Sequence, residues 1–130
     1  MPEIPVQLPE KQPTLRLMTM PSDMNPNGDI FGGWVMSQVD IAGGVAAMRR
    51  ARGRVTTVAV NAFQFKQPIS IGDVVSFYTD IVKVGRTSMT IGVQAWRRVR
   101  QSHERQLVTH GKFVFVAVGE DNRPVEIPAG

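Results

Sequence analysis

A long and almost uncharged helical segment constrains the fold of this chain more than any other feature. Residues 33–50 read GWVMSQVDIAGGVAAMRR, in which Asp40 is the only charge before Arg49. A helix that is apolar on nearly all sides belongs in the interior of a protein rather than on its surface. Its second half holds small residues that would let a sheet approach closely, namely Ala42, Gly43, Gly44, Ala46 and Ala47. We therefore predict one central helix, with Gly53 just beyond its C-terminal end.

The rest of the chain shows β-patterns broken by turns. Residues 89–96 alternate apolar with other side chains, which is typical of a half-buried antiparallel strand. The predicted strands are 14–20, 55–67, 74–84, 89–100 and 107–118, with a loop at 22–31 and a short hairpin link at 85–88. One apolar helix and one antiparallel sheet can bury each other only if the sheet curls around the helix. The predicted class is α+β, with a long antiparallel sheet wrapped around one helix.

The N-terminal segment differs in composition from the rest. Residues 1–13 hold four of the nine prolines and no apolar periodicity, so we expect an extended, poorly ordered arm. Residues 14–130 are enough for a single domain with its own core. Neither a long apolar run nor a charged-then-apolar leader occurs, so we expect a cytoplasmic protein that does not associate with membranes.

The composition excludes several kinds of chemistry. The chain has no cysteine, so disulfides, thiolate metal sites and cysteine nucleophiles are impossible. His103 and His110 do not have the spacing of metal ligands, so we expect no metal site. A Gly-x-Ser-x-Gly motif is also missing, which argues against a serine hydrolase.

The charge of the chain favours anionic ligands. Eleven arginines and four lysines face eleven acids, for a formal net charge of +4. The guanidinium group matches phosphate oxygens, which fits nucleic acid as well as a phosphate-rich small molecule such as coenzyme A. The few aromatic residues do not alternate with basic ones, so we expect no nucleic-acid partner. Arg97, Arg98 and Arg100 are interpreted as an exposed face or an oligomer contact.

The segment just before the helix carries the clearest functional signal. Residues 25–33 read NPNGDIFGG and lead directly into the helix that bears Asp40. Glycines at a helix start leave N–H groups uncovered where the helix dipole favours negative charge. A carboxylate in an apolar helix is costly unless it has a partner or a function. Together these features indicate acyl-transfer chemistry, although Ser37 could hold Asp40 structurally and Asn25 could be a simple turn residue.

These two segments, Asn25–Gly33 and Asp40–Gly44, resemble the hotdog-fold acyl-CoA thioesterases, and the YciA-type branch most closely. The phrases VTTVAV at 55–60, KQPISIGD at 66–73 and KVGRTS at 83–88 agree, so the resemblance covers roughly residues 14–128. It implies hydrolysis of short- to medium-chain acyl-CoA, with no cofactor apart from the coenzyme A of the substrate. It also implies active sites between two subunits, and a hexamer built as a trimer of dimers.

The resemblance also implies roles for individual residues. The Gly33 N–H, helped by Gly32, and the Asn25 amide would polarise the thioester carbonyl. Asp40 of the partner subunit would act as general base or as nucleophile. Helix geometry supports this division: Asp40 lies seven residues beyond Gly33, roughly 10 Å along the axis, too far for one carbonyl to use both. We therefore predict an obligate homodimer.

Substrate-binding residues are implied in the same way. The resemblance places a contact with coenzyme A near Arg86, Thr87 and Ser88. Further candidates are Arg54, which belongs to a basic cluster that also complements the helix dipole, and Lys66. The acyl tunnel would be lined by Phe31, Phe63 and Phe65, although each could be an ordinary core residue.

Two other function classes remain open at this point. A non-catalytic acyl-CoA-binding sensor could use the same fold, but gene-regulating sensors carry an added helical DNA-binding segment for which thirteen residues are too few. A nucleic-acid binder could use the arginine clusters, and steeply salt-dependent binding would identify it.

Overall fold

The computed structural model describes residues 7–130 and contains one long helix and five strands. The helix is α1 (Gly32–Ala51), and a 3-10 turn, η1 (Pro21–Asp23), precedes it. The strands are β1 (Leu15–Met18), β2 (Val55–Phe65), β3 (Val74–Val84), β4 (Ser88–Arg98) and β5 (Arg105–Ala117). All predicted elements are present, with bounds that differ by a few residues. The predicted N-terminal arm lies partly outside the described residues, and residues 7–13 form neither helix nor strand.

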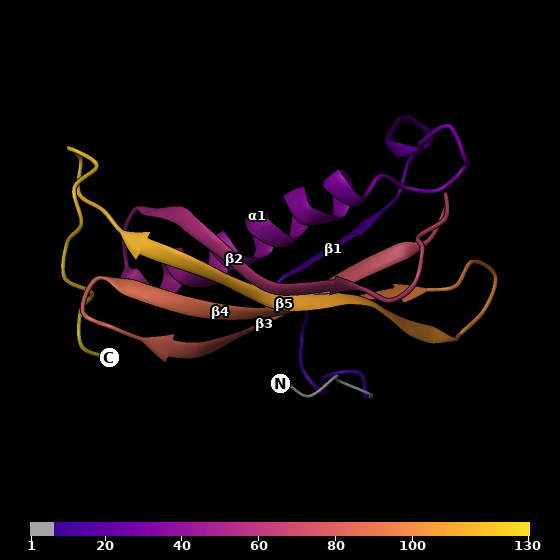
Figure 1. Cartoon of the computed structure of the whole chain (residues 1–130). Helices are drawn as coiled ribbons and strands as arrows, with labels where there is room; N and C mark the ends of the chain where they lie inside the picture. The colour runs from indigo at the N-terminus through magenta and orange to yellow at the C-terminus, as the bar shows by residue number, and fades with distance from the viewer. Residues whose placement is uncertain (1–6) are drawn as a thin grey trace.

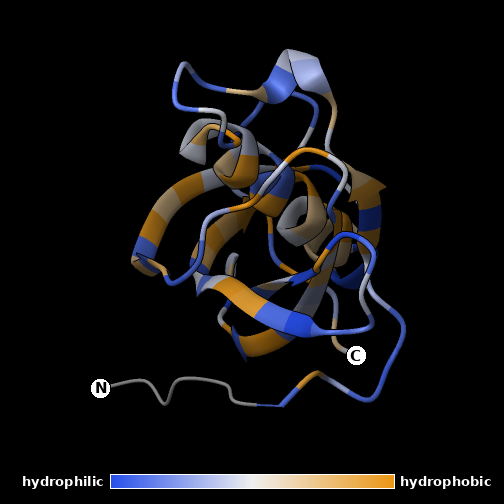
Figure 2. Cartoon of the chain, turned by 90° about the vertical axis from the view of Figure 1, so that its right-hand side faces the viewer, coloured by the Kyte–Doolittle hydropathy of each residue, from blue (hydrophilic) through white to orange (hydrophobic). Residues whose placement is uncertain are grey.

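The five strands form one antiparallel sheet in the order β1-β3-β4-β5-β2. Helix α1 lies across one face of this sheet and contacts β2, β3, β4 and β5 (Figure 1). Figure 2 looks nearly along the helix and shows the strands curving around it. The predicted hotdog arrangement, a curled sheet around one long helix, is confirmed.

The small residues of α1 do allow a close approach to the sheet. Val39 and Ala42 are fully buried, and a Cβ atom added to Gly43 would lie 3.0 Å from the Phe115 ring. The expectation that the helix is buried on nearly all sides is wrong for the single chain, because Ile41 and Met48 are 49% and 47% exposed. Five strands cover only one side of the helix.

The C-terminal end of α1 also differs from the prediction. The left-handed residue is Arg52, with φ 55°, and its N–H donates to the Met48 carbonyl. Gly53 does not have a positive φ and instead donates its N–H to the same carbonyl at 3.4 Å. Gly53 follows the end of the helix, as predicted, and the difference is that Arg52 rather than the glycine takes the left-handed conformation.

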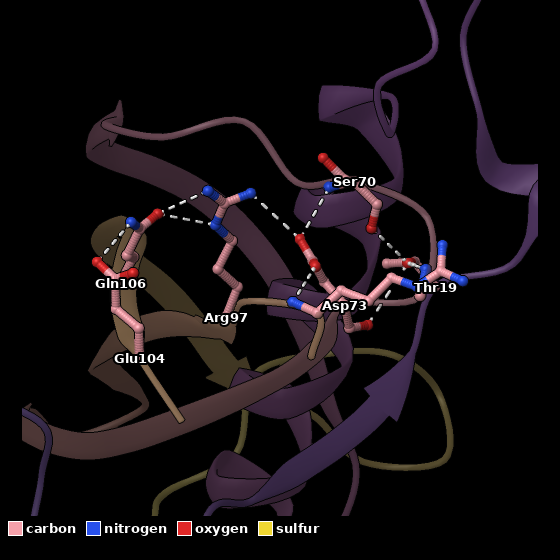
Figure 3. Close-up of polar contacts among 8 residues, drawn as sticks. Thr19, Ser70, Asp73, Arg97, Glu104 and Gln106 are labelled. Carbon is pink, nitrogen blue, oxygen red and sulfur yellow. Dashed lines mark hydrogen bonds and ion pairs between the residues drawn. The ribbon is translucent and has the colours of Figure 1, made fainter. Parts of the chain in front are cut away.

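A buried ion pair lies between β3 and β4 at the end of the sheet near η1 (Figure 3). The Asp73 carboxylate accepts hydrogen bonds from the Ser70 N–H at 2.9 Å and from the Arg97 guanidinium at 3.2 Å. Arg97 also donates twice to the side-chain oxygen of Gln106, at 2.9 and 2.6 Å. Arg97 is thus a structural residue, which corrects its interpretation as part of an exposed face. Because side chains alternate between the two faces along β4, Arg97 lies on the face of the sheet toward the helix.

Replacing Asp73 with alanine is expected to destabilise the fold by about 3–5 kcal/mol, because it leaves the Arg97 charge without its partner. The Asp73 and Arg97 side chains are only 2% and 13% exposed, so solvent cannot replace the lost carboxylate. Chemical denaturation measures this difference. Asp121→Ala is the control, since its ion pair with Arg123 is exposed and should change stability by less than about 1 kcal/mol. Equal effects of the two substitutions would contradict the structural role of Asp73.

Candidate active site

A pocket of about 380 Å³ opens beside the start of α1. It brings together four of the predicted site residues, which come from separate parts of the chain: Asn25, Gly32, Phe65 and Lys66. The rest of its wall is Asp29, Ile30, Val35, Gln67, Pro68, Ile69 and Val108. The pocket therefore combines apolar side chains with four polar ones, namely the amides of Asn25 and Gln67, the Asp29 carboxylate and the Lys66 ammonium group, and such a mixed wall is usual for a small-molecule site.

The Asn25 side chain is held by the turn that it begins. Its amide oxygen accepts the N–H groups of Asn27 at 2.9 Å and of Asp29 at 3.1 Å. Because the oxygen is committed to these two donors, the orientation of the amide is determined and its NH₂ group remains for a ligand. Asn25 is thus a turn residue, as its sequence context suggested, and the same turn presents an N–H donor at the pocket.

The N-terminus of α1 is uncovered, as the glycine pair predicted. Phe31 provides no side-chain cap, and its carbonyl accepts from Trp34 and Val35. Within residues 7–130, no backbone acceptor is found for the N–H groups of Gly32 and Gly33. A Cβ atom on Gly33 would meet nothing within 4 Å. Among these residues, the two N–H groups therefore have no backbone partner at the positive end of the helix dipole.

Asp40 lies about two helical turns from this end, and its carboxylate is held by β2. The Thr57 hydroxyl donates to the Asp40 carboxylate at 2.6 Å. Asp40 is partly exposed, and its hydrogen-bond partner is Thr57 rather than Ser37, the alternative that the sequence suggested. Thr57 was missed because two adjacent threonines in a strand point to opposite faces, and only the sheet register shows which one faces the helix.

One chain does not bring Asp40 to the pocket of Asn25. Asp40 is absent from the residues that line this pocket, and the helix rise puts it roughly 10 Å from Gly33. The two halves of the predicted site therefore exist in each chain but stand apart. This is the geometry from which a site shared between two subunits was predicted.

Thr57→Val is expected to lower kcat about ten- to a hundredfold, because a hydrogen bond to a charged group is worth about 1.5–3 kcal/mol. Valine keeps the shape of the side chain and removes only the donor that orients Asp40. Steady-state kinetics with an acyl-CoA substrate measures the effect. Thr56→Val is the matched control, because Thr56 is exposed on the opposite face of the same strand. Similar kinetics for the two variants would show that Thr57 does not position Asp40.

The residues expected to contact coenzyme A lie at the other end of the molecule. Arg86 and Thr87 lie in the link between β3 and β4, and Ser88 is the first residue of β4, at the end where α1 finishes (Figure 1). The Arg54 guanidinium donates to the Glu120 carbonyl at 3.3 Å and to the Asn122 side chain at 2.9 Å. Part of its donor capacity is therefore used to hold the C-terminal turn.

The three predicted tunnel aromatics differ in their surroundings. Phe63 packs edge-on against Phe113, with ring centroids 5.6 Å apart, and is partly buried against the core. Phe65 lies 5.9 Å from Phe63 but is 52% exposed, and Phe31 is 49% exposed. Only Phe65 of the three lines the pocket.

Among the groups of residues 7–130, only His110 has a clearly shifted pKa. Burial lowers the pKa of His110, and the positive charge of Lys66 lowers it further. Its Nε2 atom is buried and has no hydrogen-bond partner within residues 7–130. Within residues 7–130, no group of three or more metal-ligating side chains is found. No helix in this range is long and apolar enough to cross a membrane.

Strand β2 leaves apolar side chains uncovered at the edge of the sheet. It is the last strand on one side, so the backbone groups of its outer edge have no neighbouring strand in the described part of the chain. Val58, Val60 and Phe65 are 54%, 45% and 52% exposed. An exposed apolar edge strand is a ready template for pairing with another chain.

Several known proteins are similar to this chain in sequence and in fold. The family model of the thioesterase superfamily matches residues 27–102. The acyl-CoA thioester hydrolase YciA of Salmonella typhimurium is 43% identical over 123 residues, which cover 92% of each chain. A hexameric thioesterase from Yersinia pestis has a TM-score of 0.90 at 42% identity, covering 95% of this chain and all of that one. A hexameric broad-specificity acyl-coenzyme A thioesterase has a TM-score of 0.88 at 46% identity, covering 95% and 85%.

Proposed function

The chain belongs to the thioesterase superfamily, and from this membership we propose that it is an acyl-CoA thioester hydrolase. Its products would be coenzyme A and a carboxylic acid of short to medium chain length. The observation that carries the proposal is the uncovered N-terminus of α1 beside the oriented Asn25 amide, both at one pocket. A broad-specificity acyl-CoA thioesterase of the same fold supports the substrate class.

We propose that two chains pair through β2. The exposed apolar residues of this edge strand would become buried, and its free backbone groups would find partners. In an antiparallel pairing about the middle of β2, the Thr57 half of one strand would lie beside the Phe65 half of the other. Asp40 is bound to Thr57, and Phe65 lines the pocket with Asn25 and Gly32. The pairing would therefore complete each site from two subunits.

In this arrangement the thioester carbonyl would lie at the helix start, where the Asn25 NH₂ and the Gly33 N–H would donate to its oxygen. The partner's Asp40 would take a proton from water as the water attacks the carbonyl carbon. The tetrahedral oxyanion would be stabilised by the same two donors, and each such donor is worth about 3–4 kcal/mol of barrier. Collapse would break the C–S bond and release the coenzyme A thiolate, which then gains the proton.

The same pairing gives the remaining candidates a role. The start of β2 in one chain would lie beside the end of β2 in the other. The Arg86–Ser88 segment of one chain would therefore approach the end of the partner's sheet that carries Lys66. A guanidinium, two hydroxyls and an ammonium group would then be available for the phosphates of coenzyme A. We propose a trimer of such dimers, because two solved relatives are hexameric.

Thiol release from acetyl-, butyryl-, hexanoyl- and palmitoyl-CoA tests the activity. We expect turnover that is highest with the short and medium chains. A thiol-reactive dye reports coenzyme A without background, because the protein has no cysteine. An enzyme that binds these esters but releases no thiol would be a sensor instead, and one that does neither would contradict the proposed function.

A further inference from the structure

A second pocket lies on the face of the sheet that α1 does not cover. It has a volume of about 220 Å³ and contains three arginines, each from a different strand: Arg16 of β1, Arg98 of β4 and Arg105 of β5. Its other lining residues are Leu8, Val74, Ser76, Tyr78 and Trp96. It shares no residue with the pocket of Asn25, and none of its lining residues is acidic.

The register of the sheet explains why these side chains meet. Arg16 is paired with Ser76, and Ser76 with Trp96, which makes one row across three strands. In the adjacent row on the same face, Val74 is paired with Arg98, and Arg98 with Arg105. Residues two positions apart in a strand lie on the same face, so these two rows are neighbours on one face of the sheet. The three guanidinium groups therefore gather over a single patch.

This arrangement is electrostatically costly for the protein alone. Arg98 and Arg105 are direct cross-strand partners, and like charges in that relation destabilise a sheet. The ion pairs found within residues 7–130 involve Lys11, Arg97 and Arg123, and none involves the three pocket arginines. The three arginines, whose side chains are exposed to solvent, therefore have no ion-pair partner among the described residues.

The residues at the bottom of the pocket are largely buried. Ser76, Tyr78 and Trp96 are 8%, 4% and 5% exposed, although no helix lies over them. The Ser76 hydroxyl accepts from Arg16 Nε at 2.7 Å, which orients that guanidinium at the pocket wall. The Arg105 guanidinium donates one hydrogen bond to the His103 carbonyl at 2.9 Å, and its other N–H groups remain for a ligand. A partly desolvated floor strengthens the attraction of these charges for an anion.

We propose that this pocket binds a phosphate dianion, either as inorganic phosphate or as the phosphate group of a larger monoester. Guanidinium forks match phosphate oxygens and would neutralise the charge that the three arginines concentrate. The volume is below the range of about 300–1,000 Å³ usual for whole small-molecule ligands, which suits one phosphate group rather than a complete nucleotide. The proposal goes beyond the proposed hydrolase activity and uses none of its residues.

Calorimetric titration of the assembled protein with inorganic phosphate, at constant pH and ionic strength in chloride, tests the proposal. We expect saturable binding, weakened about tenfold or more in Arg98→Gln and in Arg105→Gln, because each variant loses a charge-assisted contact. Arg123→Gln is the matched control, since its side chain is 84% exposed and outside the pocket, and it should bind like the wild type. Titration with ribose 5-phosphate distinguishes the two sources: tighter binding than inorganic phosphate indicates a monoester.

Thermal unfolding in chloride, without phosphate, is an independent test, because the proposal predicts the direction in which the melting temperature changes. Arg105→Gln should melt at a higher temperature than the wild type, because it removes the repulsion from Arg98. If the glutamine variants fail to assemble, Arg98→Lys and Arg105→Lys, which keep the charge but lose the fork, should still weaken phosphate binding. Absence of phosphate binding by the wild type, or equal binding by wild type and pocket variants, would overturn the proposal. Phosphate binding and melting temperature do not depend on turnover, so their results are independent of the thiol-release assay.

Discussion

Replacing Asp40 with asparagine is expected to lower kcat for acyl-CoA hydrolysis about a hundred- to ten-thousand-fold, the range that a placed general base contributes. Asparagine keeps the size of the side chain and can still accept the Thr57 hydrogen bond, which is 2.6 Å long in the structure. It cannot take a proton from water. The loss should therefore appear in kcat, while size-exclusion chromatography shows an intact assembly and KM changes little.

The matched control for this experiment is Asp80→Asn. Asp80 is an exposed carboxylate that pairs with Lys11, and it does not line the pocket of Asn25. Its variant should keep the wild-type kcat. A folded Asp40→Asn protein with the full kcat would exclude Asp40 as the base.

Asn25→Asp is expected to lower kcat about a hundred- to a thousand-fold, the usual effect of losing one oxyanion donor. Aspartate keeps an oxygen for the N–H groups of Asn27 and Asp29, so the turn is preserved. It removes the NH₂ group and places a negative charge where the oxyanion would form. Asn25→Ala would lose the turn contacts as well, which makes it the less specific variant.

Kinetics at saturating substrate and circular dichroism together measure this effect. Asn27→Ala is the control, because Asn27 is exposed in the same turn and contributes only its backbone N–H to Asn25. It should remain active. If Asn25→Asp folds normally and hydrolyses acyl-CoA at the wild-type rate, the amide does not act on the thioester.

The parts of this fold that follow local rules could be predicted from the sequence. The long apolar segment, the alternating strands and the hairpin link at residues 85–88 all appear in the structure with small changes at their ends. The helix was expected to begin at the glycine pair Gly32–Gly33, and its start is uncovered because the residue at the cap position, Phe31, has no polar side chain. Local patterns of this kind need no knowledge of the rest of the chain.

The parts that depend on sheet register could not be predicted. Thr57 and Thr56 are adjacent and chemically identical, yet only Thr57 reaches Asp40. Asp73 and Arg97 are 24 positions apart, and their ion pair forms because β3 and β4 align them. The same alignment gathers Arg16, Arg98 and Arg105, which appear in the sequence as scattered surface charges.

Mixing two inactive variants tests most directly whether each active site is shared by two subunits. Asn25→Asp and Asp40→Asn proteins are combined in equal amounts under conditions that allow subunit exchange, and exchange is verified by mass spectrometry of the mixed assembly. In a two-fold dimer with random exchange, half of the dimers are mixed and each holds one intact site, so activity should return to about a quarter of the wild-type value. Activity that stays at the level of the separate variants, despite verified exchange, would place Asn25 and Asp40 in the same chain's site and contradict the shared site.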